Sequence, residues 1–285
     1  MTRRASRPVR VFAAALAAGT LLTTAACSDD GDGGSNASDV AAPDVAASSV
    51  TDEARAASPL AARTSTAPAR LTEAGARAAL ITEADIEDDW TKVDDAATWR
   101  DELLVGKVDV AGFLTAKTNA ADCQKLLDGL YADDLLGKPA GASALIGFEQ
   151  GDSRLLHQVA AYDRAPLAAS LTWLGTLPDK CDQFTATDTK DGKRTVQVIE
   201  TSVPKEGDAR QGLRVTVQGT TNGTATTLTL DVMAVRVGDD AITVTAGGLD
   251  GDESDSAEQA VKEGTSRLKD VLAGKTPAAD PGNDD

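Results

Sequence analysis

The sequence predicts an α+β domain in which helices pack on a curved antiparallel β-sheet. Between residues 71 and 177, several segments place apolar residues three or four positions apart, which is typical of amphipathic helices. After Phe184 the apolar period changes to two, as in half-buried strands. Ser254 to Leu272 returns to the helical period, so helices precede and follow the strands. This order favours a sheet with helices packed against it.

Two short helices are predicted where the domain begins. Leu71 to Leu80 has helical spacing. Thr82 is suited to cap a short helix over Glu83 to Asp89, because its hydroxyl can accept a hydrogen bond from a free backbone N–H. That second helix leads directly to Trp90.

Two longer helices are predicted in the middle of the chain. Asn119 to Leu136 carries an apolar face at helical spacing, made of Cys123, Leu127, Leu130, Tyr131 and Leu135. Ala165 to Leu177 forms the next helix. We expect Pro178 to end that helix just before Cys181, because proline cannot continue the hydrogen-bond ladder.

Strands are predicted on both sides of the second long helix. Ala142 to Gln150 and Leu155 to Tyr162 are joined by the turn sequence Gly151-Asp152-Ser153. Val196 to Val203 and Ala241 to Ala246 are further strands. The closing helix then covers Ser254 to Leu272, with Ala257, Val261, Gly264, Leu268 and Val271 facing inward.

A β-hairpin is predicted between the two clearest alternating segments. Leu213 to Val217 and Leu228 to Val232 each alternate apolar and polar residues, and Asn222-Gly223 between them favours a tight two-residue turn. After Val232 the apolar phase shifts by one residue. We therefore expect a β-bulge at Val232-Met233.

The first 26 residues have the pattern of a secretory signal peptide. Four arginines within residues 1–10 precede an uncharged apolar run, Val11 to Leu22, which is too short to span a bilayer. Small residues then lead to Cys27, so the segment resembles a bacterial lipobox, although Thr24 stands where leucine is usual. This predicts a diacylglyceryl group on Cys27 that attaches the chain to the outer face of the cell membrane. The alternative is an ordinary signal peptide followed by an incidental cysteine.

Residues 27–70 predict a disordered tether, and residues 276–285 a disordered tail. The tether is rich in Ala, Ser, Asp, Gly, Thr and Pro and has no aromatic residue, so it cannot bury enough apolar surface to offset its ordering entropy. The folded domain is therefore predicted at 71–275. Removal of residues 1–26 would take away four arginines and no acid, which changes the net charge from −17 to −21.

Composition excludes several classes of function. A net charge of −17 and a pI near 4.4 argue against nucleic acid as a partner, because the phosphate backbone requires clustered lysines and arginines. His157 is the only histidine, which leaves most zinc, haem and histidine-based catalytic sites without their residues. We therefore predict no metal, no cofactor and no enzymatic activity.

Cys123 and Cys181 are predicted to form a disulfide bond. They are the two cysteines left once Cys27 is lipidated, and an exported chain favours oxidised cysteines. Because one lies on a helix and the other follows a helix, the bond would join the two helices. The alternative is two free, buried thiols.

Two motifs suggest catalysis or metal binding, but the sequence favours neither function. Gly151-Asp152-Ser153 resembles the nucleophile block of GDSL-type hydrolases, but that chemistry needs a correctly placed histidine base, and a turn explains the motif more simply. Four acids, Asp250, Asp252, Glu253 and Asp255, suggest calcium. An EF-hand loop counted from Asp250 lacks the required Gly and Glu, and acids also suit the first turn of a helix.

The aromatic residues gather in one part of the mature chain, from Trp90 to Phe184. The simpler interpretation is that they form the core between the helices and the early strands. In the functional interpretation, Trp90 or Trp99 lines a ligand-binding groove, since both lie in loop-like surroundings.

Several motifs in residues 80–272 resemble the extracellular sensor domains of the actinobacterial PknH-like family. The motifs are Ile81-Thr-Glu-Ala-Asp-Ile86 with Trp90, Cys123-x-x-Leu-Leu127, Val159-Ala-Ala-Tyr162, Leu174 with Cys181-Asp-Gln-Phe184, and Val235-Arg-Val-Gly-Asp239 with Ile242-Thr-Val-Thr245. The resemblance implies a strongly curved antiparallel sheet with flanking helices and a cleft for an unidentified ligand. Members attached to kinases have two disulfides, whereas only one is available here.

The leading hypothesis is a lipid-anchored, non-catalytic sensor or binding module of the bacterial envelope that captures a ligand in a cleft. The second hypothesis is a structural or protein-interaction lipoprotein without a small-molecule ligand. A sizeable concave pocket would favour the first, and a flat apolar patch without a pocket would favour the second.

Overall fold

A computed structural model of the chain confirms the α+β class and the curved antiparallel sheet. It describes residues 70–86, 89–96, 104–105, 108–109, 111–189, 192–221, 223–249 and 253–277. The predicted signal peptide, Cys27, Trp99 and nearly all of the tether and tail lie outside these residues. Every strand pairing in the described part is antiparallel.

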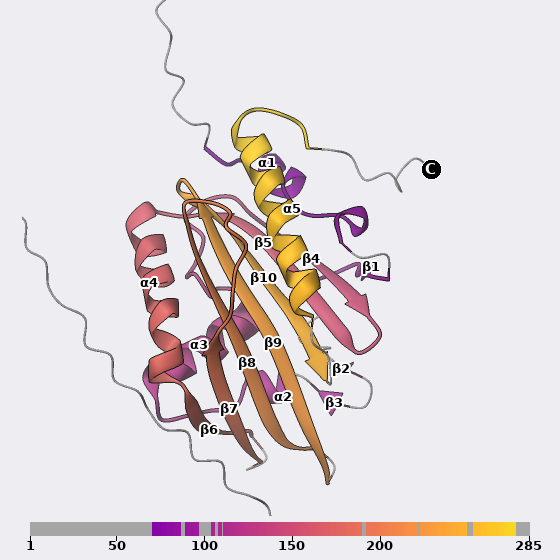
Figure 1. Cartoon of the computed structure of the whole chain (residues 1–285), viewed down its shortest axis with the longest axis vertical. Helices are drawn as coiled ribbons and strands as arrows, with labels where there is room; N and C mark the ends of the chain where they lie inside the picture. The colour runs from indigo at the N-terminus through magenta and orange to yellow at the C-terminus, as the bar shows by residue number, and fades with distance from the viewer. Residues whose placement is uncertain are drawn as a thin grey trace, which may run out of the picture. The chain divides into compact units, whose positions relative to one another are not determined.

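One eight-stranded sheet forms the centre of the domain (Figure 1). Its strands in spatial order are β1 (Thr91–Lys92), β4 (Ser143–Gln150), β5 (Ser153–Ala161), β10 (Asp240–Leu249), β9 (Thr224–Val237), β8 (Ala209–Thr221), β7 (Lys193–Glu200) and β6 (Gln183–Thr187). A small separate sheet pairs β2 (Leu104–Val105) with β3 (Val108–Asp109). The helices are α1 (Glu73–Ala78), the 3₁₀ helix η1 (Glu83–Asp85), α2 (Ala111–Leu114), α3 (Ala121–Ala132), α4 (Arg164–Lys180) and α5 (Ser254–Leu272).

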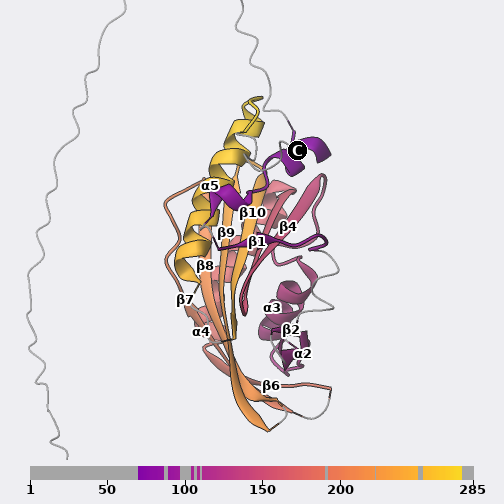
Figure 2. The same ribbon diagram turned by 90° about the vertical axis from the view of Figure 1, so that its right-hand side faces the viewer.

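Helices cover the sheet on both faces, and each face has its own hydrophobic cluster. The first cluster packs α2, α3 and α4 against β7, β8 and one face of β9. The second packs α1, η1 and α5 against β4, β5, β10 and the other face of β9. Figure 2 shows α5 and α3 on opposite sides of the sheet and the β8–β9 hairpin curving away at its end.

The predicted bulge at Val232-Met233 is wrong. The pairing of β9 with both β8 and β10 runs through these residues without interruption. Leu230 and Val232 belong to the first cluster, whereas Met233 and Val235 belong to the second. The apolar phase changes because this part of β9 is covered on both faces, so both sets of alternating side chains are buried.

The hairpin itself is confirmed. Thr221 pairs with Thr224 across a two-residue connection. Gly223 has a φ of 81°, a left-handed conformation that glycine adopts without strain and that a tight hairpin turn requires. The strands are much longer than predicted, because their ends are polar and the alternation fades before the pairing does.

Two helices show how accurately the helical period predicts where a helix ends. The closing helix α5 has the predicted bounds, Ser254 to Leu272. The helix α4 does not end before Pro178, as predicted, but continues to Lys180. Proline costs only one backbone hydrogen bond in the last turn, and the Cys181 N–H still donates to the Leu177 carbonyl at 2.7 Å.

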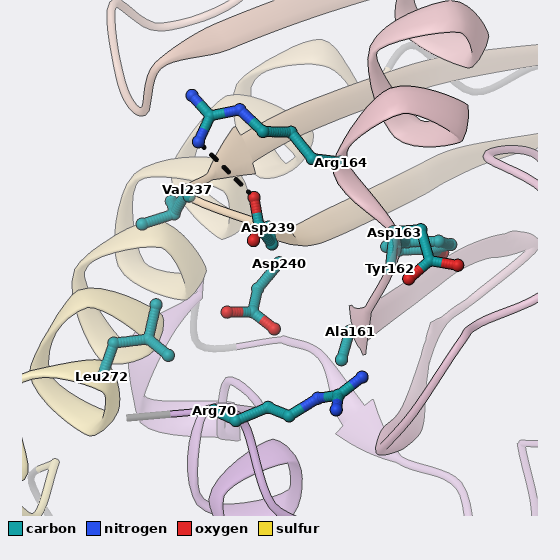
Figure 3. Close-up of a pocket in the computed structure, with 10 residues that line it drawn as sticks. Arg70, Ala161, Tyr162, Asp163, Arg164, Val237, Asp239, Asp240 and Leu272 are labelled. Atoms are coloured by element: carbon teal, nitrogen blue, oxygen red, sulfur yellow. Dashed lines mark ion pairs between the residues drawn. The ribbon is translucent and has the colours of Figure 1, made fainter. Parts of the chain in front are cut away.

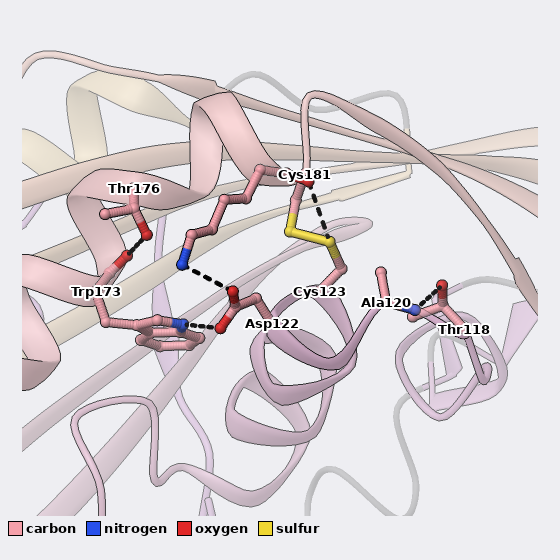
Figure 4. Close-up of a disulfide and its surroundings, with 8 residues drawn as sticks. Thr118, Ala120, Asp122, Cys123, Trp173, Thr176 and Cys181 are labelled. Atoms are coloured by element: carbon pink, nitrogen blue, oxygen red, sulfur yellow. Dashed lines mark hydrogen bonds and ion pairs between the residues drawn. A yellow bond between two sulfur atoms is a disulfide. The ribbon is translucent and has the colours of Figure 1, made fainter.

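The disulfide between Cys123 and Cys181 is confirmed and joins α3 to the end of α4 (Figure 4). The two Cα atoms are 5.6 Å apart, within the range that a disulfide spans. Polar contacts beside the bond join the same two helices. The Asp122 carboxylate accepts hydrogen bonds from the Trp173 indole at 3.0 Å and from the Lys180 ammonium at 2.8 Å, and both bonds lower the pKa of Asp122.

Replacement of both cysteines by alanine tests how much this bond stabilises the domain. The cysteines are 58 residues apart, so the chain-entropy estimate is about 4 kcal/mol as an upper value. We expect Cys123→Ala/Cys181→Ala to lower the free energy of unfolding by about 2–4 kcal/mol in urea denaturation. Wild-type protein treated with a reductant is the control and should unfold like the variant. An unchanged urea midpoint in both samples would contradict the expectation.

Candidate functional site

Trp90 lies in the core and not at the wall of a groove. Its side chain is only 3% exposed and belongs to the second hydrophobic cluster. The indole N–H donates to the Ser256 hydroxyl on α5 at 3.3 Å, which satisfies its one polar atom inside the core. This geometry gives no support to ligand contact by Trp90. Trp99, the other predicted groove residue, lies outside the described residues.

Ser153 and His157 do not form a nucleophile–base pair. The Ser153 hydroxyl donates to the Glu253 carboxylate at 2.5 Å. His157 is fully buried under α5, where an added Cβ on Gly264 would clash with its ring. Neither ring nitrogen has a hydrogen-bond partner in the described part of the chain, and burial lowers the pKa of His157 to about 3. The ring is therefore neutral and packs as a core residue.

A cavity of about 340 Å³ opens where the second hydrophobic cluster ends. Its lining side chains come from four places that are distant in sequence, and Figure 3 shows them facing a common space. They are Arg70 before α1, residues 161–164 at the junction of β5 and α4, residues 237–240 at the turn from β9 to β10, and Leu272 at the end of α5.

The turn from β9 to β10 is held firmly. Gly238 and Asp239 connect the two strands, and Gly238 has a φ of 66°. The Gly238 N–H donates to the Asp208 carboxylate at 2.7 Å, and the Tyr162 N–H donates to the Asp239 carbonyl at 3.0 Å. These bonds fix the backbone of the turn beside the end of β5.

Asp240 is the most unusual residue of the cavity. It is 93% buried, because its relative exposure is 7%. Figure 3 shows its carboxylate pointing into the space between Leu272, Ala161 and Arg70. No described residue donates a hydrogen bond to this carboxylate or forms an ion pair with it. Burial, together with the neighbouring charge of Asp239, raises the pKa of Asp240 to about 6, and the Arg70 charge opposes the rise.

The other largely buried aspartates in the described chain differ from Asp240 because each has an arginine. Arg214 holds the Asp231 carboxylate with two bonds of 2.9 and 3.0 Å. Arg194 bonds to Asp188 at 2.7 Å, and Arg267 bonds to Asp85 at 3.1 Å. Unpaired buried charge is costly, so this protein normally supplies a counter-charge. Asp240 is thus an exception that points to a function.

The charged residues at the rim of the cavity are less constrained. Arg164 and Asp239 form an ion pair of 3.7 Å, but their side chains are 69% and 60% exposed. Arg70 and Asp163 are also exposed. Burial raises the pKa of the Tyr162 phenol, which therefore stays neutral. Around Asp240 the cavity is thus apolar inside, through Ala161, Val237 and Leu272, and charged at its opening.

A second cavity, of about 530 Å³, lies beside α3 but offers no comparable group. Its polar side chains are exposed or only half-buried. Several are already paired with one another, since Asp128 accepts bonds from Lys117 at 3.0 Å and from Gln124 at 2.7 Å. Because its polar side chains are within reach of solvent, none of them needs a ligand to compensate a buried charge.

Sequence reasoning missed Asp240 although the sequence carried a signal for it. Asp240 has the same strand phase as Ile242 and Val244, both of which face the second cluster. An aspartate in the buried phase of a strand is unusual and would have marked a candidate site. The predicted strand starts at Ala241, so Asp240 lies just outside it.

The described residues do not offer a metal site. Within them, no group of three or more His, Cys, Asp or Glu side chains could hold a metal ion. Of the acids considered for calcium, Asp250 and Asp252 lie outside the described residues. Nor does any described helix combine the length and apolar character needed to cross a membrane.

Comparison with known proteins gives little beyond the fold. No protein-family model matches this sequence, and no curated protein sequence matches it significantly. The chain is similar to a solved structure, the extracellular domain of PknH from Mycobacterium tuberculosis, with 12% sequence identity and a TM-score of 0.40. The match covers 73% of this chain and 100% of that one. A likeness at this level indicates at most a relationship of fold and transfers neither a site nor an activity.

The raised pKa of Asp240 predicts a particular pH dependence of stability. Between the ordinary pKa of 3.8 and the folded-state pKa of about 6, the native state holds the proton more tightly than the unfolded chain does. The contribution of Asp240 to the free energy of unfolding therefore falls as the pH rises through this window. We expect Asp240→Asn to be more stable than wild type near pH 7 and the difference to shrink towards pH 4, measured by urea denaturation.

Asp239→Asn is the matched control for this experiment. It removes the same charge one residue away, from an exposed side chain that already has an arginine partner. Because the Asp239 charge helps to raise the pKa of Asp240, this variant should keep the pH dependence of wild type but shift it towards lower pH. Parallel profiles for wild type and Asp240→Asn would show that the Asp240 carboxyl titrates normally.

Proposed function

We propose that this protein is a lipid-anchored, non-catalytic binding module on the outer face of the bacterial cell membrane, which captures a small envelope molecule in the Asp240 cavity. The observation that carries the proposal is the buried Asp240 carboxylate, which has no hydrogen-bond or ion-pair partner among the described residues and faces a cavity of about 340 Å³. That volume lies at the lower end of ligand sites. It suits a small molecule or the end group of a larger one.

The alternative, a protein-docking lipoprotein without a small ligand, has less support. It predicts an exposed apolar patch, and such patches mark docking surfaces. Among the described residues, Ile199 on β7 is the one large apolar side chain that is exposed. A concave site with an unmatched polar group therefore favours small-molecule capture over docking.

Two features support the extracytoplasmic location. The signal sequence of residues 1–26 directs export, and Cys27 provides an acylation site. The Cys123–Cys181 disulfide suits an oxidising compartment. Arg70, at the end of the predicted tether, lines the cavity, so the site lies where the domain joins its anchor.

Replacement of Cys27 tests the anchor. We expect Cys27→Ala to move the full chain from the membrane fraction to the soluble fraction and to abolish incorporation of a clickable fatty acid, because acyl chains supply the membrane affinity. The Cys123→Ala/Cys181→Ala variant is the control, since it loses two cysteines but keeps the predicted acylation site. Membrane association and labelling that survive in Cys27→Ala would exclude this anchor.

Mass spectrometry of small molecules that co-purify with the full chain tests capture. We expect at least one compound to accompany the wild type and to be depleted about tenfold in Val237→Trp, whose indole fills the cavity. Ile199→Trp adds the same group to an exposed position on β7 and should retain the compound. If wild type and Val237→Trp carry the same compounds, the cavity is not a capture site.

A further inference from the structure

We propose that the Asp240 cavity takes a small organic cation, a primary or secondary amine on a short apolar body, whose ammonium group pairs with the Asp240 carboxylate. This inference rests on the proposed function and adds the chemical class of the ligand. It follows from the absence of a positive counter-charge for Asp240, from the apolar side chains that line the cavity around this carboxylate, and from the negative charge of the chain.

Asp240 lacks the counter-charge that other buried aspartates of the described chain have. Asp231, Asp188 and Asp85 are largely buried and each bonds to an arginine within 3.1 Å, but Asp240 is 93% buried with no such partner among the described residues. The Arg70 charge acts on Asp240 and opposes the rise of its pKa, yet no ion pair of 4.0 Å or less joins the two side chains. A ligand with a positive charge completes the pattern that the other three aspartates follow.

The lining of the cavity determines what accompanies the charge. Ala161, Val237 and Leu272 present apolar surface around Asp240, and Figure 3 shows the carboxylate directed between two of them, Ala161 and Leu272. A bare metal ion would find no cluster of three or more His, Cys, Asp or Glu side chains among the described residues, although cations such as calcium need six to eight oxygen ligands. An ammonium group on an alkyl chain satisfies the carboxylate and buries its apolar body on these side chains.

The overall charge of the chain also favours a cationic ligand. The chain has a formal net charge of −17, which attracts small cations and repels anions. At the cavity itself, Asp163 lies at the opening and Asp239 holds Arg164 in an exposed ion pair. Of the described cations that line the cavity, Arg70 is the one outside an ion pair, and its exposed position lets it turn to solvent when a ligand ammonium enters.

The charged groups around Asp240 also predict how binding depends on pH. Asp239, Asp163, Arg164, Arg70 and Tyr162 face it from the turn, from the β5–α4 junction and from the segment before α1. The lining residues from β9 and α5, Val237 and Leu272, carry no charge. Because an amine stays protonated while the Asp240 carboxylate takes up a proton, affinity should fall as the pH drops through about 6.

Calorimetric titration of the full chain with three matched probes tests the inference. The probes are hexylammonium, 1-hexanol and hexanoate, which share an alkyl body and differ in charge. We expect hexylammonium to bind at least about tenfold more tightly than the other two, because a charged pair in a desolvated site outweighs alkyl burial alone. Binding should weaken below about pH 6.

Two variants give the residue-level test. Asp240→Asn keeps the shape of the side chain, removes the charge and should weaken hexylammonium about tenfold or more, with hexanol unchanged. Asp179→Asn removes the same charge near the far end of α4, about 22 Å along the helix from Arg164, and should match wild type. The wild-type pH titration does not depend on how any variant folds.

Several results would overturn the inference. These are equal binding of the three probes, preference for hexanoate, hexylammonium binding that survives Asp240→Asn, or stoichiometric calcium binding that Asp240→Asn abolishes. If these results occur while a compound still co-purifies in a Val237-dependent manner, only the ligand class is wrong. If no probe binds and nothing co-purifies, the proposed function fails as well.

Discussion

The burial of β9 on both faces is the constraint on which the rest of this domain depends. Its alternating side chains reach two separate clusters, one with α3 and α4 and the other with α5 and α1. A strand covered in this way cannot slip by one residue, because a slip would exchange the two sets of side chains. Pairing with β8 and β10 on its two edges then fixes the whole sheet.

The cavity is a consequence of where this two-sided packing stops. Along β9 and β10 the second cluster is covered by α5, but the last residue of that helix, Leu272, already lines the opening. Beyond it, the sheet continues into the Gly238-Asp239 turn, and the described residues that line the space beside Val237 and Asp240 come from Arg70, from residues 161–164 and from Leu272. A buried strand position thus becomes a concave site without any dedicated loop.

Sequence patterns predicted the elements that bury one face and misjudged those that bury two. The helix α5 has a single apolar stripe, so its bounds and most of its inward residues follow from the period of 3.6. In β9 the apolar run from Val232 to Val235 suggested a bulge, but the run is apolar because both faces of the strand are buried here. Period alone cannot separate these cases, because the covering helix is distant in sequence.

The candidate site was harder still to predict, because it depends on contacts between residues that are distant in sequence. Trp90 suggested a groove because of its loop-like surroundings, but its contact with Ser256 joins residues 166 positions apart and could not be predicted from local sequence. Asp240 lies outside the predicted strand, which begins at Ala241. Its burial depends on Leu272 and Ala161, which approach it only after the sheet and α5 have assembled.

The disulfide and the candidate site lie at opposite ends of α4. At its C-terminal end, Cys181 is bonded to Cys123, and Asp122 bridges Trp173 and Lys180. At its N-terminal end, about 25 Å away for a helix of 17 residues, Arg164 lies on the rim of the cavity. Among the described residues, the polar contacts that hold this rim are hydrogen bonds and an exposed ion pair. Local opening therefore costs less free energy at the rim than beside the disulfide. A small molecule needs this difference, since the carboxylate that we expect it to reach is more than nine-tenths buried.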